Sequence, residues 1–111
     1  MVAGYVYVMS HNDAPRLAVD FNELVADDLV LLSKVDRVVD ADGKECLLRN
    51  GLPVIAYEHN RYADGTTEYL YVEGVAEKND PEVNGAWTQA AKWCCRFKGG
   101  VEPVLNFVFE A

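Results

Sequence analysis

Residues 50–77 read NGLPVIAYEHNRYADGTTEYLYVEGVAE, and this stretch decides the fold class. It contains two turn signals, Asn50-Gly51 and Ala63-Asp64-Gly65, which precede the extended runs Pro53–Tyr57 and Thr67–Glu77. Glycine at such positions lets the chain reverse and brings the flanking runs together as antiparallel strands. The stretch therefore predicts β-strands that are joined by short turns.

The run Thr67–Glu77 alternates between two kinds of side chain, as a strand does. The aliphatic face, which we assign to the core, carries Leu70, Val72 and Ala76. The opposite face carries Tyr69, Tyr71 and Glu73. Successive side chains of a strand point to opposite sides of its sheet, so we expect only the first set inside. Gly74 interrupts the pattern, and we expect a bulge or a sharp bend there.

Turn signals between extended runs also occur in the rest of the chain. Asp40-Ala41-Asp42-Gly43 predicts another turn between strands, and Tyr5–Met9 alternates like a first strand. Trp87–Phe97 and Val104–Glu110 are interpreted as the last two strands, on either side of Gly99-Gly100. Short strands with turns about every ten residues predict a mainly β chain. We expect a small antiparallel barrel or sandwich, with an SH3-like architecture as the first choice.

One short helical turn is expected near residues 20–26. Asp20 and Glu23 are three residues apart, which is the spacing of a capping box at a helix start. The turn cannot extend far, because the compact apolar run Leu29–Leu32 follows it. That run is compatible with either a helix or a buried strand.

Length and composition predict a single β-rich domain spanning residues 1–111. Half of the 111 residues are hydrophobic and 25% are charged, as is usual for one globular domain. Met1–Ser10 lacks the basic start of a signal peptide, and no apolar run approaches the roughly 20 residues that span a bilayer. The net charge of −8 is spread along the chain, which disfavours nucleic acids and anionic membranes as partners.

A series of short stretches in residues 19–97 resembles a group of small uncharacterised bacterial proteins. The stretches are Val19-Asp20-Phe21-Asn22, Val30-Leu31-Leu32-Ser33, Asp40-Ala41-Asp42-Gly43, Arg49-Asn50-Gly51-Leu52-Pro53-Val54, Asp64-Gly65 and Lys92-Trp93-Cys94-Cys95-Arg96. The resemblance leaves out the first and last expected strands. It implies a compact β-barrel, and it brings no known activity with it.

The three cysteines, Cys46, Cys94 and Cys95, are an odd number, and two of them are neighbours. Neighbouring cysteines rarely form a disulfide, so we expect reduced thiols and a cytoplasmic location. We interpret Cys46 and Cys95 as core residues, because free cysteine is readily buried.

Cys94 is the candidate for a reactive thiol. It shares its expected strand face with Lys92 and Arg96, and both cations would favour the thiolate. The alternative is that Cys94 is a small strand residue beside two solvated cations. We favour the alternative, because thiol catalysis needs a positioned base and the sequence places neither His11 nor His59 near Cys94.

Two Tyr-x-Tyr pairs are interface candidates: Tyr5, Tyr7, Tyr69 and Tyr71. If the aliphatic residues of the long run form the core, the tyrosines project from the other face and form an aromatic contact surface. Alternatively, the N-terminal segment covers that face and buries them. The first arrangement predicts self-association as a homodimer.

No metal site or cofactor is expected. Asp40 and Asp42 invite comparison with a calcium-binding EF-hand loop, but in that register the first ligand falls on Val38 and the final acid on Arg49. A hairpin turn accounts better for these residues. The sequence also contains no phosphate-binding glycine loop and no nucleophile motif.

Four functional hypotheses remain, in order of preference. The first is a small acidic protein-interaction or accessory module that forms a homodimer or binds another protein. The second is a small-molecule binding barrel whose pocket is lined by Trp87 and Trp93. The third is an acidic inhibitor of a basic partner, supported by the charge alone. An enzyme with Cys94 as nucleophile is the last, so catalysis is uncertain and we expect none.

Overall fold

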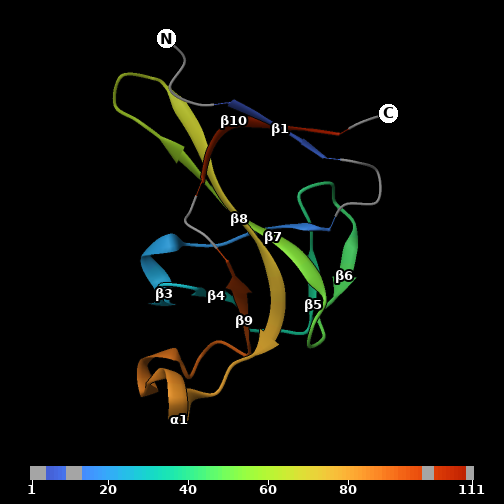
Figure 1. Ribbon diagram of the computed structural model, residues 1–111, viewed down its shortest axis with the longest axis vertical. Coiled ribbons are helices and arrows are strands. Elements are labelled where there is room, and N and C mark those ends of the chain that lie inside the picture. The colour runs from blue at the N-terminus through green and yellow to red at the C-terminus, as the bar shows by residue number, and fades with distance from the viewer. Residues whose placement is uncertain (1–4, 10–13, 99–101, 110–111) are drawn as a thin grey trace.

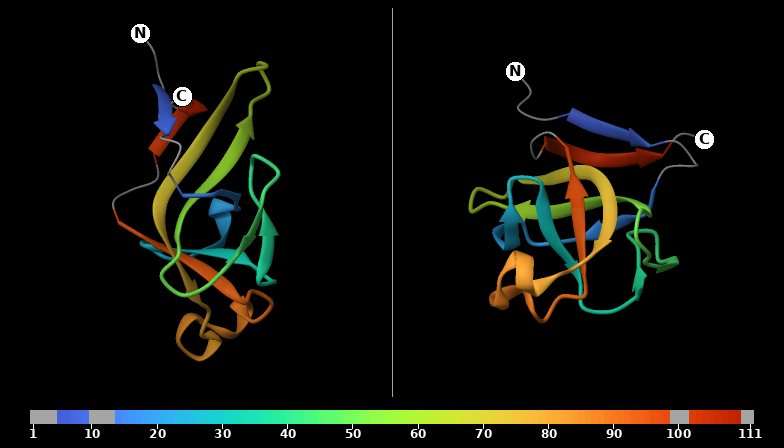
Figure 2. Two further views of the ribbon diagram at one scale, coloured as in Figure 1. Left: turned by 90° about the vertical axis from the view of Figure 1, so that its right-hand side faces the viewer. Right: turned by 60° about the horizontal axis from the view of Figure 1, so that its bottom comes forward.

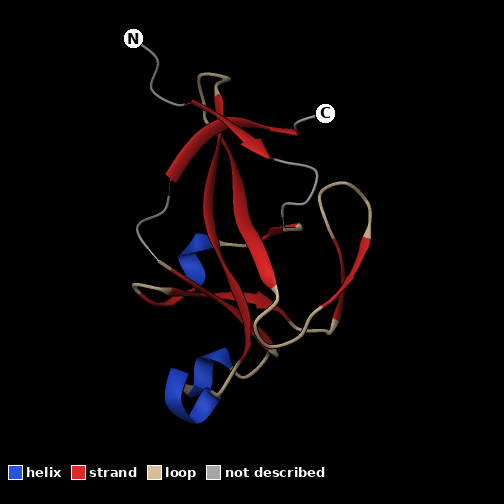
Figure 3. Cartoon of the chain, turned by 45° about the vertical axis from the view of Figure 1, so that its right-hand side comes forward, coloured by secondary structure: helices blue, strands red, loops and turns tan. Residues whose placement is uncertain are grey.

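The computed structural model describes residues 5–9, 14–98 and 102–109 (Figure 1). For residues 5–9 and 102–109 it describes only the backbone and the strand pairing. Its strands are β1 (Tyr5–Met9), β2 (Arg16–Ala18), β3 (Leu24–Ala26), β4 (Leu29–Ser33), β5 (Arg37–Val39), β6 (Glu45–Leu47), β7 (Pro53–Arg61), β8 (Thr67–Lys78), β9 (Trp93–Phe97) and β10 (Glu102–Phe109). The helical segments are η1 (Phe21–Glu23), α1 (Pro81–Asn84) and η2 (Ala86–Thr88), each about one turn long (Figure 3). The expectation of a mainly β chain is confirmed.

The hairpin of β7 and β8 is the centre of the fold, as the opening stretch predicts. The two strands pair in antiparallel fashion over nine residues, from Pro53 opposite Val75 to Arg61 opposite Thr67. The turn between them closes with hydrogen bonds from the Tyr62 N–H to the Thr66 carbonyl and from the Gly65 N–H back to the Tyr62 carbonyl.

Strand β8 is long enough to join two wings of the sheet. Its first half pairs with β10, where Tyr71 lies opposite Glu102, and its second half pairs with β9, where Gly74 lies opposite Phe97. Strand β10 continues outward to β1, and β9 continues outward to β4 and β3. The wings lie at opposite ends of β8, which curves between them (Figures 1 and 2).

Gly74 lies where β8 changes partners, at the bend that the sequence predicts. A Cβ atom added at this position would lie 2.2 Å from the carbonyl oxygen of Arg96 in β9. No side chain fits at such a distance, so glycine is required for the close approach of the two backbones.

The described strands do not close into a barrel, and two of their pairings are parallel. The hydrogen-bonded order is β1-β10-β8-β9-β4-β3, with β7 and β2 on the other edge of β8. Strand β1 runs parallel to β10, and β2 runs parallel to β7. The antiparallel barrel is therefore corrected to an open, curved, mixed sheet, and the SH3-like architecture is not confirmed. Strands β5 and β6 form a separate hairpin.

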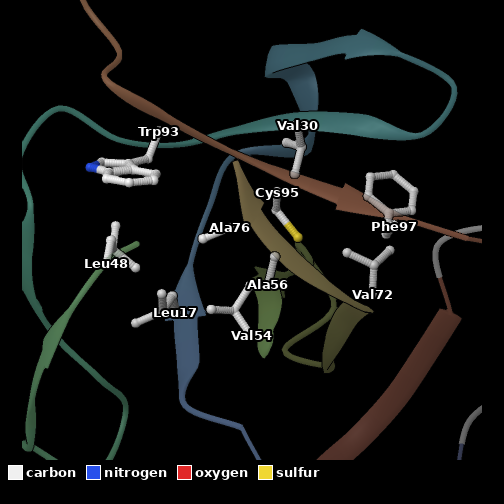
Figure 4. Close-up of a cluster of buried hydrophobic side chains, with 10 residues drawn as sticks. All are labelled: Leu17, Val30, Leu48, Val54, Ala56, Val72, Ala76, Trp93, Cys95 and Phe97. Atoms are coloured by element: carbon white, nitrogen blue, oxygen red, sulfur yellow. The ribbon is translucent and has the colours of Figure 1, made fainter. Parts of the chain in front are cut away.

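The largest core cluster lies on one side of the sheet (Figure 4). It consists of Leu17, Val30, Leu48, Val54, Ala56, Val72, Ala76, Trp93, Cys95 and Phe97. The expected inward positions Val72 and Ala76 belong to it, as does Cys95, whereas Leu70 is only half-buried. Cys46 is half-buried against the same cluster.

The other side of the sheet is also partly covered, which the alternation of β8 does not predict. A second cluster contains Ile55 and Tyr71, with Ala14, Tyr57 and Tyr69 packed against it. A third cluster contains Leu29, Leu31 and Cys94. Because apolar residues lie on both faces, period two alone does not separate core from surface in this chain.

The structure differs from the sequence-based prediction in two segments and resolves a third, ambiguous one. The helical turn near residues 20–26 is only η1, because Leu24–Ala26 is strand β3. Leu29–Ser33 is strand β4, which settles the ambiguous apolar run. The strand expected at Trp87–Phe97 begins only at Trp93. None of the helices in the described ranges has the length and apolar character that crossing a bilayer requires.

Candidate functional site

A cavity of about 490 Å³ lies between three separate segments of the chain. It is lined by residues 18–20 and 23 around η1 and by residues 87, 88, 90 and 91 around η2, which we call its two walls, and by residues 31–34 at the end of β4, which we call its floor. Ligand pockets usually measure roughly 300–1,000 Å³, so the volume suits a small organic molecule. Apolar side chains such as Val19, Leu31 and Leu32 provide part of the lining.

Trp87 is the aromatic side chain of this cavity, and it is 59% exposed. It follows Gly85, whose φ of +108° turns the chain from α1 into η2. A Cβ atom at Gly85 would lie only 3.0 Å from Cδ1 and 3.1 Å from Nε1 of the Trp87 indole. The ring therefore lies against the bare backbone of Gly85, which leaves room for it there.

The side chain of Asn79 holds the wall that carries Trp87. Its Nδ2 donates to the carbonyl oxygens of Thr88 and Ala91, both at 2.9 Å, and lies 3.1 Å from Thr88 Oγ1. Its Oδ1 accepts from Asn84 Nδ2 at 2.9 Å. One half-buried amide thus connects α1, η2 and the segment that precedes β9.

The residues just before this wall also explain why helix α1 starts where it does. Asp80 caps α1 by accepting from the Glu82 N–H, and Pro81 occupies the first helical turn. Proline at the first position and an acidic cap before it favour a helix start. The sequence Asn79-Asp80-Pro81 is thus a signal for α1 that the strand-based prediction missed.

Charged groups of both signs lie around the cavity. Asp20 and Glu23 belong to the wall formed by η1, and Lys34 belongs to the segment after β4. Asp20 Oδ1 accepts from the Asn22 N–H at 2.9 Å and so caps η1. Within the part of the chain that the structure describes, these three residues form no ion pair with one another or with other groups.

Trp93, the other predicted pocket residue, does not line the cavity. Its side chain is only 4% exposed and belongs to the main core cluster. The indole Nε1 donates to Asp36 Oδ1 at 2.9 Å, and the Lys92 ammonium pairs with the same carboxylate. The pairing of Trp87 with Trp93 in one pocket is therefore wrong, because residues 87 and 93 lie in different elements that face different surroundings.

The structure gives Cys94 the surroundings of an inert thiol. Its side chain is fully buried, and burial raises its pKa to about 11, with the Glu77 carboxylate acting in the same direction. Arg96 opposes this rise only weakly, because its guanidinium pairs with Glu77 and Asp28. Lys92 is held by Asp36. These surroundings agree with the favoured interpretation of Cys94 as a structural strand residue and oppose activation by the two cations: the thiol stays protonated at neutral pH.

The tyrosines of β8 are not a free aromatic face. Tyr71 is only 8% exposed, and Tyr69 is half-buried between Tyr57 and the stacked ring of His59, whose centroid lies 4.5 Å away. Burial of Tyr71 agrees with the alternative in which this face is covered. The side chains of Tyr5 and Tyr7 lie outside the described residues.

The turn at residues 40–43 is the hairpin turn that the sequence predicts. Asp40 Oδ1 accepts from the Asp42 and Lys44 N–H groups at 2.9 Å, and Gly43 has a φ of +83°. Asp42 pairs with Arg16 at 2.7 Å. Across the described ranges, no three histidine, cysteine or acidic side chains gather closely enough to hold a metal ion.

Comparison of the chain with known protein families, curated proteins and solved structures finds no match. The resemblance to small bacterial proteins therefore stays a prediction. The function is inferred from the geometry of the cavity.

Proposed function

We propose that the protein binds a small organic molecule in the cavity between η1, β4 and η2. The observation that carries the proposal is a cavity of about 490 Å³ with an exposed indole at its rim. Aromatic and aliphatic walls with a few polar groups are typical of ligand sites. It corresponds to the second hypothesis from the sequence, with Trp87 lining the cavity and Trp93 in the core.

The cavity wall is also well fixed, which favours binding. The Asn79 amide ties residues 84, 88 and 91 together, and the buried Thr88 Oγ1 donates to the Gly85 carbonyl at 2.7 Å. A wall that is ordered before binding loses little conformational entropy when a ligand enters. A ligand that packs against Trp87 therefore needs little further ordering of this wall.

The two tryptophans provide an internal control for a binding test. In a ¹H–¹⁵N spectrum each indole N–H gives one signal, and Trp93 lies in the core while Trp87 lies at the cavity. We expect members of a fragment collection to shift the Trp87 indole signal and the Thr88 and Ser33 amide signals. The Trp93 indole signal should stay in place.

Removing the ring is the decisive control. Trp87→Ala should abolish these shifts at Thr88 and Ser33, whereas Val83→Ala, which removes an exposed side chain from the neighbouring helix, should not. Fragment binding that does not depend on Trp87, or that shifts only the Trp93 signal, would refute the proposed site.

Self-association is our second proposal, now through a different surface from the tyrosines. On the outer face of the β5–β6 hairpin, Val39 and Leu47 are 63% and 62% exposed. Val39 lies opposite Glu45 and Leu47 lies opposite Arg37, so the two apolar side chains are diagonal neighbours on one face. Light scattering after size-exclusion chromatography should give a dimer for wild type and a monomer for Leu47→Ser. A wild-type monomer would remove the proposal.

The free thiols Cys46, Cys94 and Cys95 support a reducing compartment, and we propose the cytoplasm.

A further inference from the structure

The charged groups around the cavity point to the chemistry of its ligand. Two carboxylates, Asp20 and Glu23, and one ammonium, Lys34, line it together with Trp87. We propose that the ligand is a small organic cation, in which an ammonium group is carried on an apolar body. This inference rests on the proposed function, since it names the class of molecule that the same cavity takes.

The two carboxylates of this wall are not among the five acids that the structure records in ion pairs. Acids that pair with a cation within 4 Å are Asp28, Asp36, Asp42, Glu45 and Glu77. Asp20 and Glu23 form no such pair within the described residues, although they lie three positions apart at one turn of η1. Their negative charge therefore remains available to a cation that enters the cavity.

Trp87 adds a second interaction that distinguishes a cation from a neutral molecule. Indole has the strongest negative face among the aromatic side chains and attracts an ammonium within about 6 Å of the ring. The ring packs against Gly85 and is otherwise largely exposed, so it can accept a partner from the cavity. We expect an ammonium in the cavity to be attracted both by the indole and by the η1 carboxylates, because all three groups line it.

Lys34 limits the ligand to a single positive charge. Its ammonium lies on the segment after β4, and it repels a second cationic group on the same molecule. With two carboxylates and one ammonium, the lining carries a net charge of −1 by this count. The protein as a whole carries −8, which attracts cations over longer distances.

The test uses three probes of one shape and different charge: 2-phenylethylammonium, 2-phenylethanol and phenylacetate. Each is titrated while the Trp87 indole signal is followed. We expect the ammonium to bind about tenfold more tightly than the alcohol, and phenylacetate to bind most weakly. Raising the salt concentration should reduce the difference, because exposed charges are screened.

The variants separate charge from shape. In Asp20→Asn/Glu23→Gln both side chains keep their size, and asparagine retains the oxygen that caps η1. This variant should bind the ammonium about fivefold more weakly and the alcohol unchanged. Lys34→Gln should bind the ammonium more tightly. Glu82→Gln, which removes an exposed acid of α1 that does not line the cavity, is the matched control and should behave as wild type.

The possible outcomes are distinct. Preference for the ammonium that is lost in Asp20→Asn/Glu23→Gln and kept in Glu82→Gln supports the inference. If the three probes bind equally, or if phenylacetate binds best, the inference of a cationic ligand is wrong while the proposed function stands. If none of the probes and no fragment shifts the Trp87 signal, both the inference and the proposed function are overturned.

Discussion

Replacing Asn79 by alanine should destabilise the cavity wall more than any other polar substitution in it. The Asn79 amide donates to the Thr88 and Ala91 carbonyls and accepts from Asn84, each at 2.9 Å. Two amide protons cannot fully serve three acceptors, so we count the contact with Thr88 Oγ1 as shared and take three hydrogen bonds as lost. At about 1 kcal/mol each, the substitution should cost about 3 kcal/mol.

The matched comparison is Asn84→Ala. This variant removes one of the three hydrogen bonds and leaves Asn79 with its contacts to Thr88 and Ala91, so it should cost about 1 kcal/mol. The assay is urea unfolding, with amide hydrogen exchange at Thr88 and Ala91 as a local measure of the wall. Both amides should exchange faster in Asn79→Ala.

The reasoning would be refuted if Asn79→Ala unfolded within about 0.5 kcal/mol of wild type and exchange at Thr88 and Ala91 were unchanged. A loss in Asn84→Ala as large as that in Asn79→Ala would also contradict it, because the structure makes Asn79 the common partner.

Three further predictions follow from the backbone and the thiols. Gly74→Ala should cost about 2–3 kcal/mol in urea unfolding, since its Cβ would collide with the Arg96 carbonyl, and a cost below 1 kcal/mol would contradict the close approach. Gly85→Ala should displace Trp87, because the residue has a positive φ and its Cβ would touch the indole; the tryptophan emission and fragment binding should both change, and unchanged spectra would oppose this. The buried Cys94 thiol, with a pKa raised from 9.0 to about 11, stays protonated in the folded state at a pH where the unfolded chain has lost the proton. Its contribution to stability is therefore present below pH 9 and is lost as the pH rises toward 11, so the free energy of unfolding should fall over this range and fall less in Cys94→Ala.

Local sequence signals predict the centre of this fold well. Asp64 and Gly65 mark the turn of the β7–β8 hairpin, and Gly74 marks the place where β8 bends and changes its partner. These features depend on residues close together in the sequence, so turn chemistry and period two are enough to find them.

The two parallel strand pairings, β1 with β10 and β2 with β7, could not be predicted from local sequence signals. Strand β1 pairs with β10 across nearly the whole chain, and β2 pairs with β7 across about forty residues of intervening sequence. Neither pairing has a turn signal, because the strands are not joined by a hairpin. The burial of Tyr71 is a result of the same long-range packing, which covers the second face of the sheet.

The cavity was predicted only in part, for a related reason. The sequence predicts Trp87 as a pocket residue, but it predicts Asp20 and Glu23 as a helix cap and gives no signal for Lys34. The three segments that form the site are distant in the sequence, and no turn or periodicity signal joins them. The Asn79 network, for which a pattern search has no template, holds only the segment of residues 84–91.

The most direct test of the proposed function is to locate a bound probe by intermolecular nuclear Overhauser effects. We predict contacts from the ring protons of 2-phenylethylammonium to the Trp87 indole and to the methyl groups of Val19 and Leu31, which belong to the three different segments that line the cavity. Contacts confined to other residues, such as Val39 and Leu47 of the β5–β6 hairpin, would contradict the account.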